Sequence, residues 1–257
     1  MLIAAAAMLA VACGKHGTES NAGGSGSNPP LHTGSGSAVG SATLRGDHDP
    51  TSAIVKQAFG GNQPAFPQLS KGGNTAAVEL QTQVGLSGVS TYAVAFIPTN
   101  GAPHLVTLVD AKLVHLLLES LETGEAPTFD IVTLTRTATE ITTRFAREGF
   151  TAFEGTVDEL GVGDEISAGP LKLKVTEAPD GGILVRVMNA TGAPLTTDAI
   201  APTPMGNVGD IDCTSNPIAR KAWFDAARKR VLLQISWNAG PDQCDSPDDQ
   251  YRLWAAP

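Results

Sequence analysis

Few residues in this chain have the types and spacing that catalysis or metal binding requires. The histidines are the first candidates. The chain has 257 residues and five histidines, of which only His104 and His115 fall in the part expected to fold. A histidine can act as the general base for a serine or cysteine nucleophile, as in hydrolases. No nucleophile, metalloprotease or nucleotide-binding motif accompanies either residue, and His115 lies among leucines. We therefore expect a non-catalytic binding or structural domain, with a periplasmic hydrolase that lacks a visible motif as the alternative.

A second group is a run of aspartates near the C-terminus. Carboxylates in this number could surround Ca²⁺, which takes about six to eight oxygen ligands. The run lacks the regular spacing of a calcium-binding loop, so it predicts a solvated acidic loop, and we expect no metal or other cofactor. The residues concerned are Asp242, Asp245, Asp248 and Asp249, with Asp210 and Asp212 as further candidates.

The first of the three cysteines follows an apolar N-terminal segment. Residues 1–12 read MLIAAAAMLAVA and carry no charge. This run is too short to span a bilayer, which takes about 20 apolar residues. It is typical of the apolar part of an export signal, although the Lys or Arg that usually begins such a signal is missing. Small residues then lead directly to Cys13.

Residues 10–13, Ala-Val-Ala-Cys, resemble the lipobox of bacterial lipoproteins. The resemblance covers four residues and departs from the commonest form, which has Leu first and Ala or Ser second. It implies that the signal at 1–12 is removed and that Cys13 becomes a lipidated N-terminus. Several acyl chains would hold the protein firmly, because each buried CH₂ contributes about 0.8 kcal/mol. In that family, a residue other than Asp directly after the lipidated Cys directs the protein to the outer membrane. Gly14 therefore favours an outer-membrane lipoprotein that faces the periplasm. A plain secreted protein and a cytosolic one are the alternatives.

Residues 13–50 form a Gly/Ser-rich stretch that predicts a disordered tether. Such a composition cannot bury enough apolar surface to offset the entropy of ordering the backbone. A flexible coil of about 37 residues reaches roughly 35 Å. The stretch contains His16, His32 and His48. The triplet Asp47-His48-Asp49 could bind a metal, but a metal site needs three or four ligands on a held scaffold, so we expect none here.

The remaining cysteines, Cys213 and Cys244, form an even pair once Cys13 is assigned to lipid. Cysteines of exported proteins join in oxidising compartments, so we predict a disulfide between them. The bond would close a loop of 32 residues. Its stabilisation is about 3.7 kcal/mol in the chain-entropy model. Two buried free thiols are the alternative.

The net charge of −9 limits the class of partner. Nucleic acid is not expected, because binding phosphates calls for a clustered basic face. An acidic domain is not drawn to anionic lipid by its charge, so the membrane contact is expected through the lipid on Cys13. An envelope protein remains a possible partner.

Residues 51–257 are expected to fold as one β-rich domain. Apolar residues alternate with polar ones over 171–175, and they recur at every second position over 183–187 and 231–237, which predicts strands with a buried face. A helix is predicted over 134–149, ending at Gly149, whereas 111–121 fits a helix or a buried strand equally well. The predicted fold class is α+β, mainly antiparallel β hairpins with one or two helices, following the disordered N-terminal tether.

Overall fold

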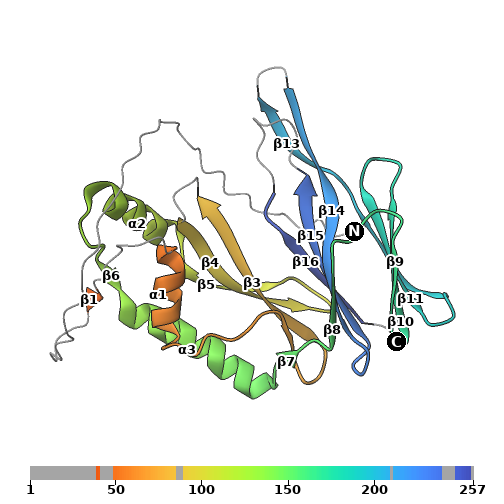
Figure 1. Ribbon diagram of the computed structural model, residues 1–257, viewed down its shortest axis with the longest axis horizontal. Coiled ribbons are helices and arrows are strands. Elements are labelled where there is room, and N and C mark those ends of the chain that lie inside the picture. The colour runs from red at the N-terminus through yellow and green to blue at the C-terminus, as the bar shows by residue number, and fades with distance from the viewer. Residues whose placement is uncertain (1–38, 41–48, 85–88, 209–210, 239–246, 256–257) are drawn as a thin grey trace, which may run out of the picture.

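The computed structural model describes residues 39–40, 49–84, 89–208, 211–238 and 247–255 (Figure 1). The predicted signal at 1–12, Cys13 and most of the predicted tether lie outside these residues. Within them, three helices accompany antiparallel sheets. The α+β class with mainly antiparallel strands is therefore confirmed. No helix in the described ranges has the length and apolar character needed to cross a membrane.

The N-terminal part of the described chain forms the first sheet, which has five strands and carries the helices on one face (Figure 1). In sheet order its strands are β5 (His104–Val109), β4 (Val89–Pro98), β3 (Thr75–Val84), β2 (Gln68–Leu69) and β7 (Thr151–Ala152). The helices are α1 (Pro50–Ala58), α2 (Ala111–Thr123) and α3 (Ile131–Glu148).

The C-terminal part forms two further sheets that lie face to face. The second sheet has the order β13 (Thr203–Val208), β14 (Ile211–Asp225), β15 (Arg230–Asn238) and β16 (Gln250–Ala255), and β8 (Gly155–Asp158) pairs with β14. The third sheet has the order β12 (Pro194–Ile200), β11 (Ile183–Asn189), β10 (Leu171–Glu177) and β9 (Glu165–Ala168). The layers in Figure 1 therefore run from the helices through the first and second sheets to the third.

Strand β15 shows how the second sheet is buried on both faces. Leu233 and Ile235 pack toward the third sheet, in one core with residues of β10 and β11. Leu232, directly before Leu233, packs toward the first sheet with Val78 and Ala95. Side chains of a strand alternate between faces, so a strand with a sheet on each side buries consecutive apolar residues.

The sequence-predicted strand faces at 171–175, 183–187 and 231–237 are confirmed. Their alternate residues enter the core between the second and third sheets: Leu171, Leu173, Val175, Ile183, Val185, Val187, Val231, Leu233, Ile235 and Trp237. The hairpin between β10 and β11 turns at Gly181, whose φ of 82° is easily reached by glycine.

Helices α2 and α3 begin and end with the expected chemistry. Asp110 accepts a hydrogen bond from the Leu113 backbone N–H at the start of α2, which resolves the ambiguity over 111–121 in favour of a helix. The predicted helix at 134–149 is confirmed as α3, which begins three residues earlier and ends at Gly149 in the left-handed conformation.

A third helix, α1, exceeds the one or two that the sequence predicted. It begins at Pro50, where the predicted tether ends, and Asp49 accepts a hydrogen bond from the Thr51 backbone N–H as its cap. Proline at the first helical position after an aspartate cap is a typical helix start. Within the predicted tether, the two residues of β1 (Val39–Gly40) pair with β6 (Phe129–Asp130).

The hairpin tip between β14 and β15 contacts the first sheet. Arg228 pairs there with Asp225, whose carboxylate is 1% exposed, at 3.4 Å. The same guanidinium donates to the Leu69 carbonyl at 3.2 Å and to Thr151 Oγ1. These contacts connect β2 and β7 of the first sheet to the second sheet.

Candidate functional site

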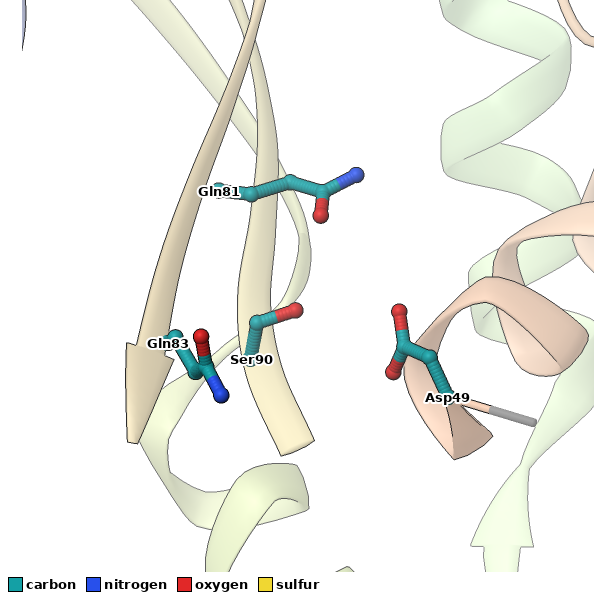
Figure 2. Close-up of a pocket in the computed structure, with 4 residues that line it drawn as sticks. All are labelled: Asp49, Gln81, Gln83 and Ser90. Carbon is teal, nitrogen blue, oxygen red and sulfur yellow. The ribbon is translucent and has the colours of Figure 1, made fainter. Parts of the chain in front are cut away.

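A polar cavity of about 360 Å³ lies between the start of α1 and strands β3 and β4. It is lined by Asp49, Gln81, Gln83 and Ser90. Figure 2 shows Gln81 and Ser90 reaching from the strands toward the helix start, and the Asp49 carboxylate facing them across the gap. Among the described residues, the cavity lining thus combines one carboxylate with two carboxamides and one hydroxyl.

The start of α1 is held on β4 by a reciprocal pair of hydrogen bonds. Thr51 is fully buried, and its Oγ1 donates to the Ser90 carbonyl and accepts from the Ser90 backbone N–H, each at 3.0 Å. Asp49 accepts from the Thr51 backbone N–H at 2.9 Å and from Ser52 Oγ at 2.7 Å. A carboxylate has about four acceptor positions, so Asp49 can still accept from a ligand.

Strand β3 places Gln81 and Gln83 on the face that also carries Glu79, because side chains of a strand repeat every two residues. Gln81 Nε2 donates to Glu79 Oε1. Burial raises the pKa of the half-buried Glu79 carboxyl, and the hydrogen bond from Gln81 opposes this increase. Glu79 and Gln81 are thus joined by a hydrogen bond, and Gln81 and Gln83 line the cavity.

The chain has two tyrosines near Glu79: Tyr92 is buried and Tyr251 is partly buried. The Tyr92 hydroxyl accepts from Gln63 Nε2 at 2.9 Å, and burial, followed by the negative charge of Glu79, raises its pKa. Burial raises the pKa of Tyr251 to about 12, and the charges of Asp249 and Glu79 add to the increase. Both phenols therefore ionise less readily in the folded protein than a free tyrosine does.

A spectrophotometric titration of the tyrosines tests this burial. In the folded protein we expect phenolate absorbance only near and above pH 12, against about pH 10 for the unfolded chain. The folded pKa values lie above the unfolded one, so stability is retained below pH 10 and lost as the pH rises further. A titration midpoint at about pH 10 for either phenol in the folded protein would contradict the burial.

The lining of the cavity is suited to binding a polar, uncharged ligand. Each carboxamide offers two N–H donors and one carbonyl acceptor, and a hydroxyl can donate and accept. The carboxylate accepts only, and its bonds to hydroxyl donors are charge-assisted. Such a set matches neighbouring hydroxyl groups, which donate and accept at close spacing.

His104 lies on β5 at the edge of the first sheet, outside the lining of this cavity. Its Nδ1 is 3.3 Å from Arg144 Nη1, and Arg144 Nε bonds Glu148 at 2.8 Å. The Arg144 guanidinium also lies 3.7 Å from the centre of the Phe96 ring. These contacts are typical of a helix packed on a sheet, with the cation over an aromatic face.

His115 is also outside the cavity lining. Its side chain is 73% exposed on α2, and Nε2 lies 3.3 Å from Glu119 Oε1, one helical turn away. This is the geometry of a side-chain pair at positions i and i+4 on the exposed surface of a helix. The structure therefore brings neither sequence-identified histidine to the cavity.

The aspartates near the C-terminus are only partly described. Asp248 accepts from Thr82 Oγ1 at 3.0 Å, and Asp249 accepts from Gln234 Nε2. Over the described ranges, no group of three or more His, Cys, Asp or Glu residues could hold a metal ion. Three of the candidate calcium ligands lie outside the described residues, and so does the side chain of a fourth: Asp210, Asp242 and Asp245, and Asp212.

Cys213 is 2% exposed on β14 and is disulfide-bonded. Cys244 and Cys13 both lie outside the described residues. The pairing of Cys213 with Cys244 and the lipidation of Cys13 therefore stay predictions.

Comparison with known proteins adds no relative to this description. A scan of family models and searches of curated proteins and of solved structures found no match to the chain.

Proposed function

We propose that this is an exported, lipid-anchored envelope protein whose folded part is a non-catalytic binding domain. The apolar segment 1–12, Cys13 and the Gly/Ser-rich stretch after it support the anchor. The proposed location is the outer membrane, with the domain facing the periplasm. The disulfide-bonded state of Cys213 agrees with an oxidising compartment.

The polar cavity supports binding as the role of the domain. Its volume of about 360 Å³ is in the range of small-molecule sites, which is about 300–1,000 Å³. Such sites are mostly apolar, whereas the described residues of this lining, Asp49, Gln81, Gln83 and Ser90, are all polar. A small neutral ligand rich in hydroxyl groups fits this lining best. His104 and His115, on which a hydrolase would depend, are not part of it.

Titration with glucose, a compact neutral polyol, tests the proposal by nuclear magnetic resonance. We expect the side-chain amide signals of Gln81 and Gln83 to shift as the sugar is added. The amide of Gln234, on the second sheet, is the internal reference and should stay in place. Asp49→Asn should weaken binding about tenfold, because it removes charge-assisted hydrogen bonds.

Asparagine caps helices as well as aspartate does, so Asp49→Asn separates ligand binding from the stability of α1. Gln57→Ala, at an exposed position on the same helix, is the matched control and should leave the affinity unchanged. Amide signals that do not move at high sugar concentration, or that move equally in all glutamines, would contradict the proposed site.

A further inference from the structure

The outer face of the third sheet carries a cluster of basic side chains. On β10, Leu171, Leu173 and Val175 point into the core shared with the second sheet. Lys172 and Lys174 lie between them in sequence and therefore occupy the opposite face. Figure 1 places this sheet as the outermost layer of the described structure, on the side away from the helices.

Arg186 of β11 extends this cluster across the sheet. It lies directly opposite Lys174 in the antiparallel register, and its neighbours Val185 and Val187 point into the core. Glu165 lies opposite Lys174 on the other side, on β9. We call the four outward residues Lys172, Lys174, Arg186 and Glu165 the basic face.

The charges of the basic face do not cancel. Glu165 lies 3.8 Å from the Lys172 ammonium and 3.6 Å from that of Lys174, so one carboxylate serves two lysines. Arg186 has no carboxylate partner among the described residues. The face therefore has a net charge of +2 on a chain whose total is −9.

The juxtaposition of Lys174 and Arg186 costs stability. Like charges directly opposite on one sheet face are destabilising, because their Cβ atoms lie about 5 Å apart. An anionic partner would relieve this repulsion. The basic face is positive whereas the whole chain is negative. An acidic partner would therefore be attracted to this face and repelled by the rest of the surface.

We propose that the basic face binds an acidic, extended segment of a partner protein. Lys172 and Lys174 are two residues apart on one strand, which separates them by about 6.8 Å. Carboxylates at alternate positions of an extended peptide have the same spacing, so such a segment can lie along β10 with one carboxylate for each cation. The guanidinium of Arg186 adds a bidentate contact to a carboxylate at the side. An anionic bilayer is a poorer match, because the whole acidic chain would be repelled from it.

A fluorescence anisotropy titration with a labelled peptide tests the proposal. The probe is a peptide of about ten residues with glutamate at alternate positions and serine between them, spaced as the strand requires. We expect binding at about 50 mM salt that weakens strongly toward about 500 mM, because salt screens exposed charges. A peptide with glutamine in place of glutamate should not bind.

Two double variants that each remove two positive charges separate the basic face from net charge. Lys174→Gln with Arg186→Gln should weaken binding at least about tenfold. Lys56→Gln with Lys112→Gln, at exposed positions on α1 and α2, should change it less than about twofold. An equal loss in the two double variants would overturn the proposal.

Two further measurements keep the result interpretable. Arg186→Gln alone should unfold at the same or a higher temperature than the unchanged protein, because it removes the like-charge pair, and it should still weaken peptide binding. Vesicles containing phosphatidylglycerol should not bind the protein purified without its lipid. Vesicle binding that depends on Lys174 and Arg186, without peptide binding, would overturn the choice of an acidic protein segment. The basic face and the cavity of Figure 2 lie on different layers, so failure at one leaves the other testable.

Discussion

Replacing Arg228 with methionine is expected to lower the free energy of unfolding by about 3 kcal/mol, because it removes the ion-pair partner of a buried carboxylate. Asp225 is 1% exposed, and its Oδ2 lies 3.4 Å from Arg228 Nη1. Methionine preserves much of the apolar stem, so the loss reports on the charge and its hydrogen bonds. The bonds from Arg228 to Leu69 and Thr151 of the first sheet are lost as well.

Urea unfolding followed by tryptophan fluorescence measures this loss. Arg252→Met is the control, because Arg252 is exposed on β16 of the same sheet and should change stability by less than about 0.5 kcal/mol. Because Arg228 connects the first and second sheets, its loss should also separate their unfolding transitions. A loss below about 1 kcal/mol would mean that solvent or the nearby charge of Arg230 compensates the Asp225 carboxylate, and it would contradict the assigned role of Arg228.

Truncating either of two consecutive leucines of β15 is expected to cost about 2–5 kcal/mol. Leu232 and Leu233 are both fully buried, Leu232 against the first sheet and Leu233 against the third. Each leucine-to-alanine change removes apolar contacts and leaves a cavity. Measuring the unfolding free energies of Leu232→Ala and Leu233→Ala by urea denaturation under the same conditions therefore tests whether the second sheet is covered on both faces.

Leu184→Ala is the matched control for these truncations. Leu184 lies on the outward face of β11 and is only half-buried, so its truncation should cost about 1 kcal/mol or less. A small cost for Leu232→Ala, comparable with that of Leu184→Ala, would show that the first sheet does not cover the second. The layered arrangement would then be wrong at that interface.

The strands whose periodicity is strongest were predictable from the sequence. The apolar residues at every second position over 171–175 and 183–187 arise because one face of the third sheet meets the core and the other meets solvent. In contrast, Leu232 of β15 is buried as well, and no local pattern reveals that the first sheet will cover it. The order of the layers depends on such contacts between distant parts of the chain.

The helices differ in predictability for similar reasons. Helix α3 has a long amphipathic pattern and a terminal glycine, whereas α2 has apolar residues on more than one side, so its pattern also fits a strand. Helix α1 has only nine residues and follows a polar, glycine-rich stretch. Its start signal, Asp49 followed by Pro50, was nevertheless present.

The candidate site could not be predicted from the sequence. Asp49 and Ser90 are 41 positions apart and meet only because α1 packs on β4. Gln81 and Gln83 belong to no motif, and carboxamides are common on exposed strand faces. The alternation of β3, together with the capping role of Asp49, is the only local signal that points toward the cavity.

The intact mass of the protein extracted from membranes, measured before and after reduction, tests the central claim most directly. A lipid-anchored export product should begin at Cys13, carry the additional mass of its acyl chains, and gain about 2 Da when one disulfide is reduced. That result would establish the anchor and the oxidised state of the remaining cysteine pair together. A mass without acyl chains that retains residues 1–12 would contradict the account.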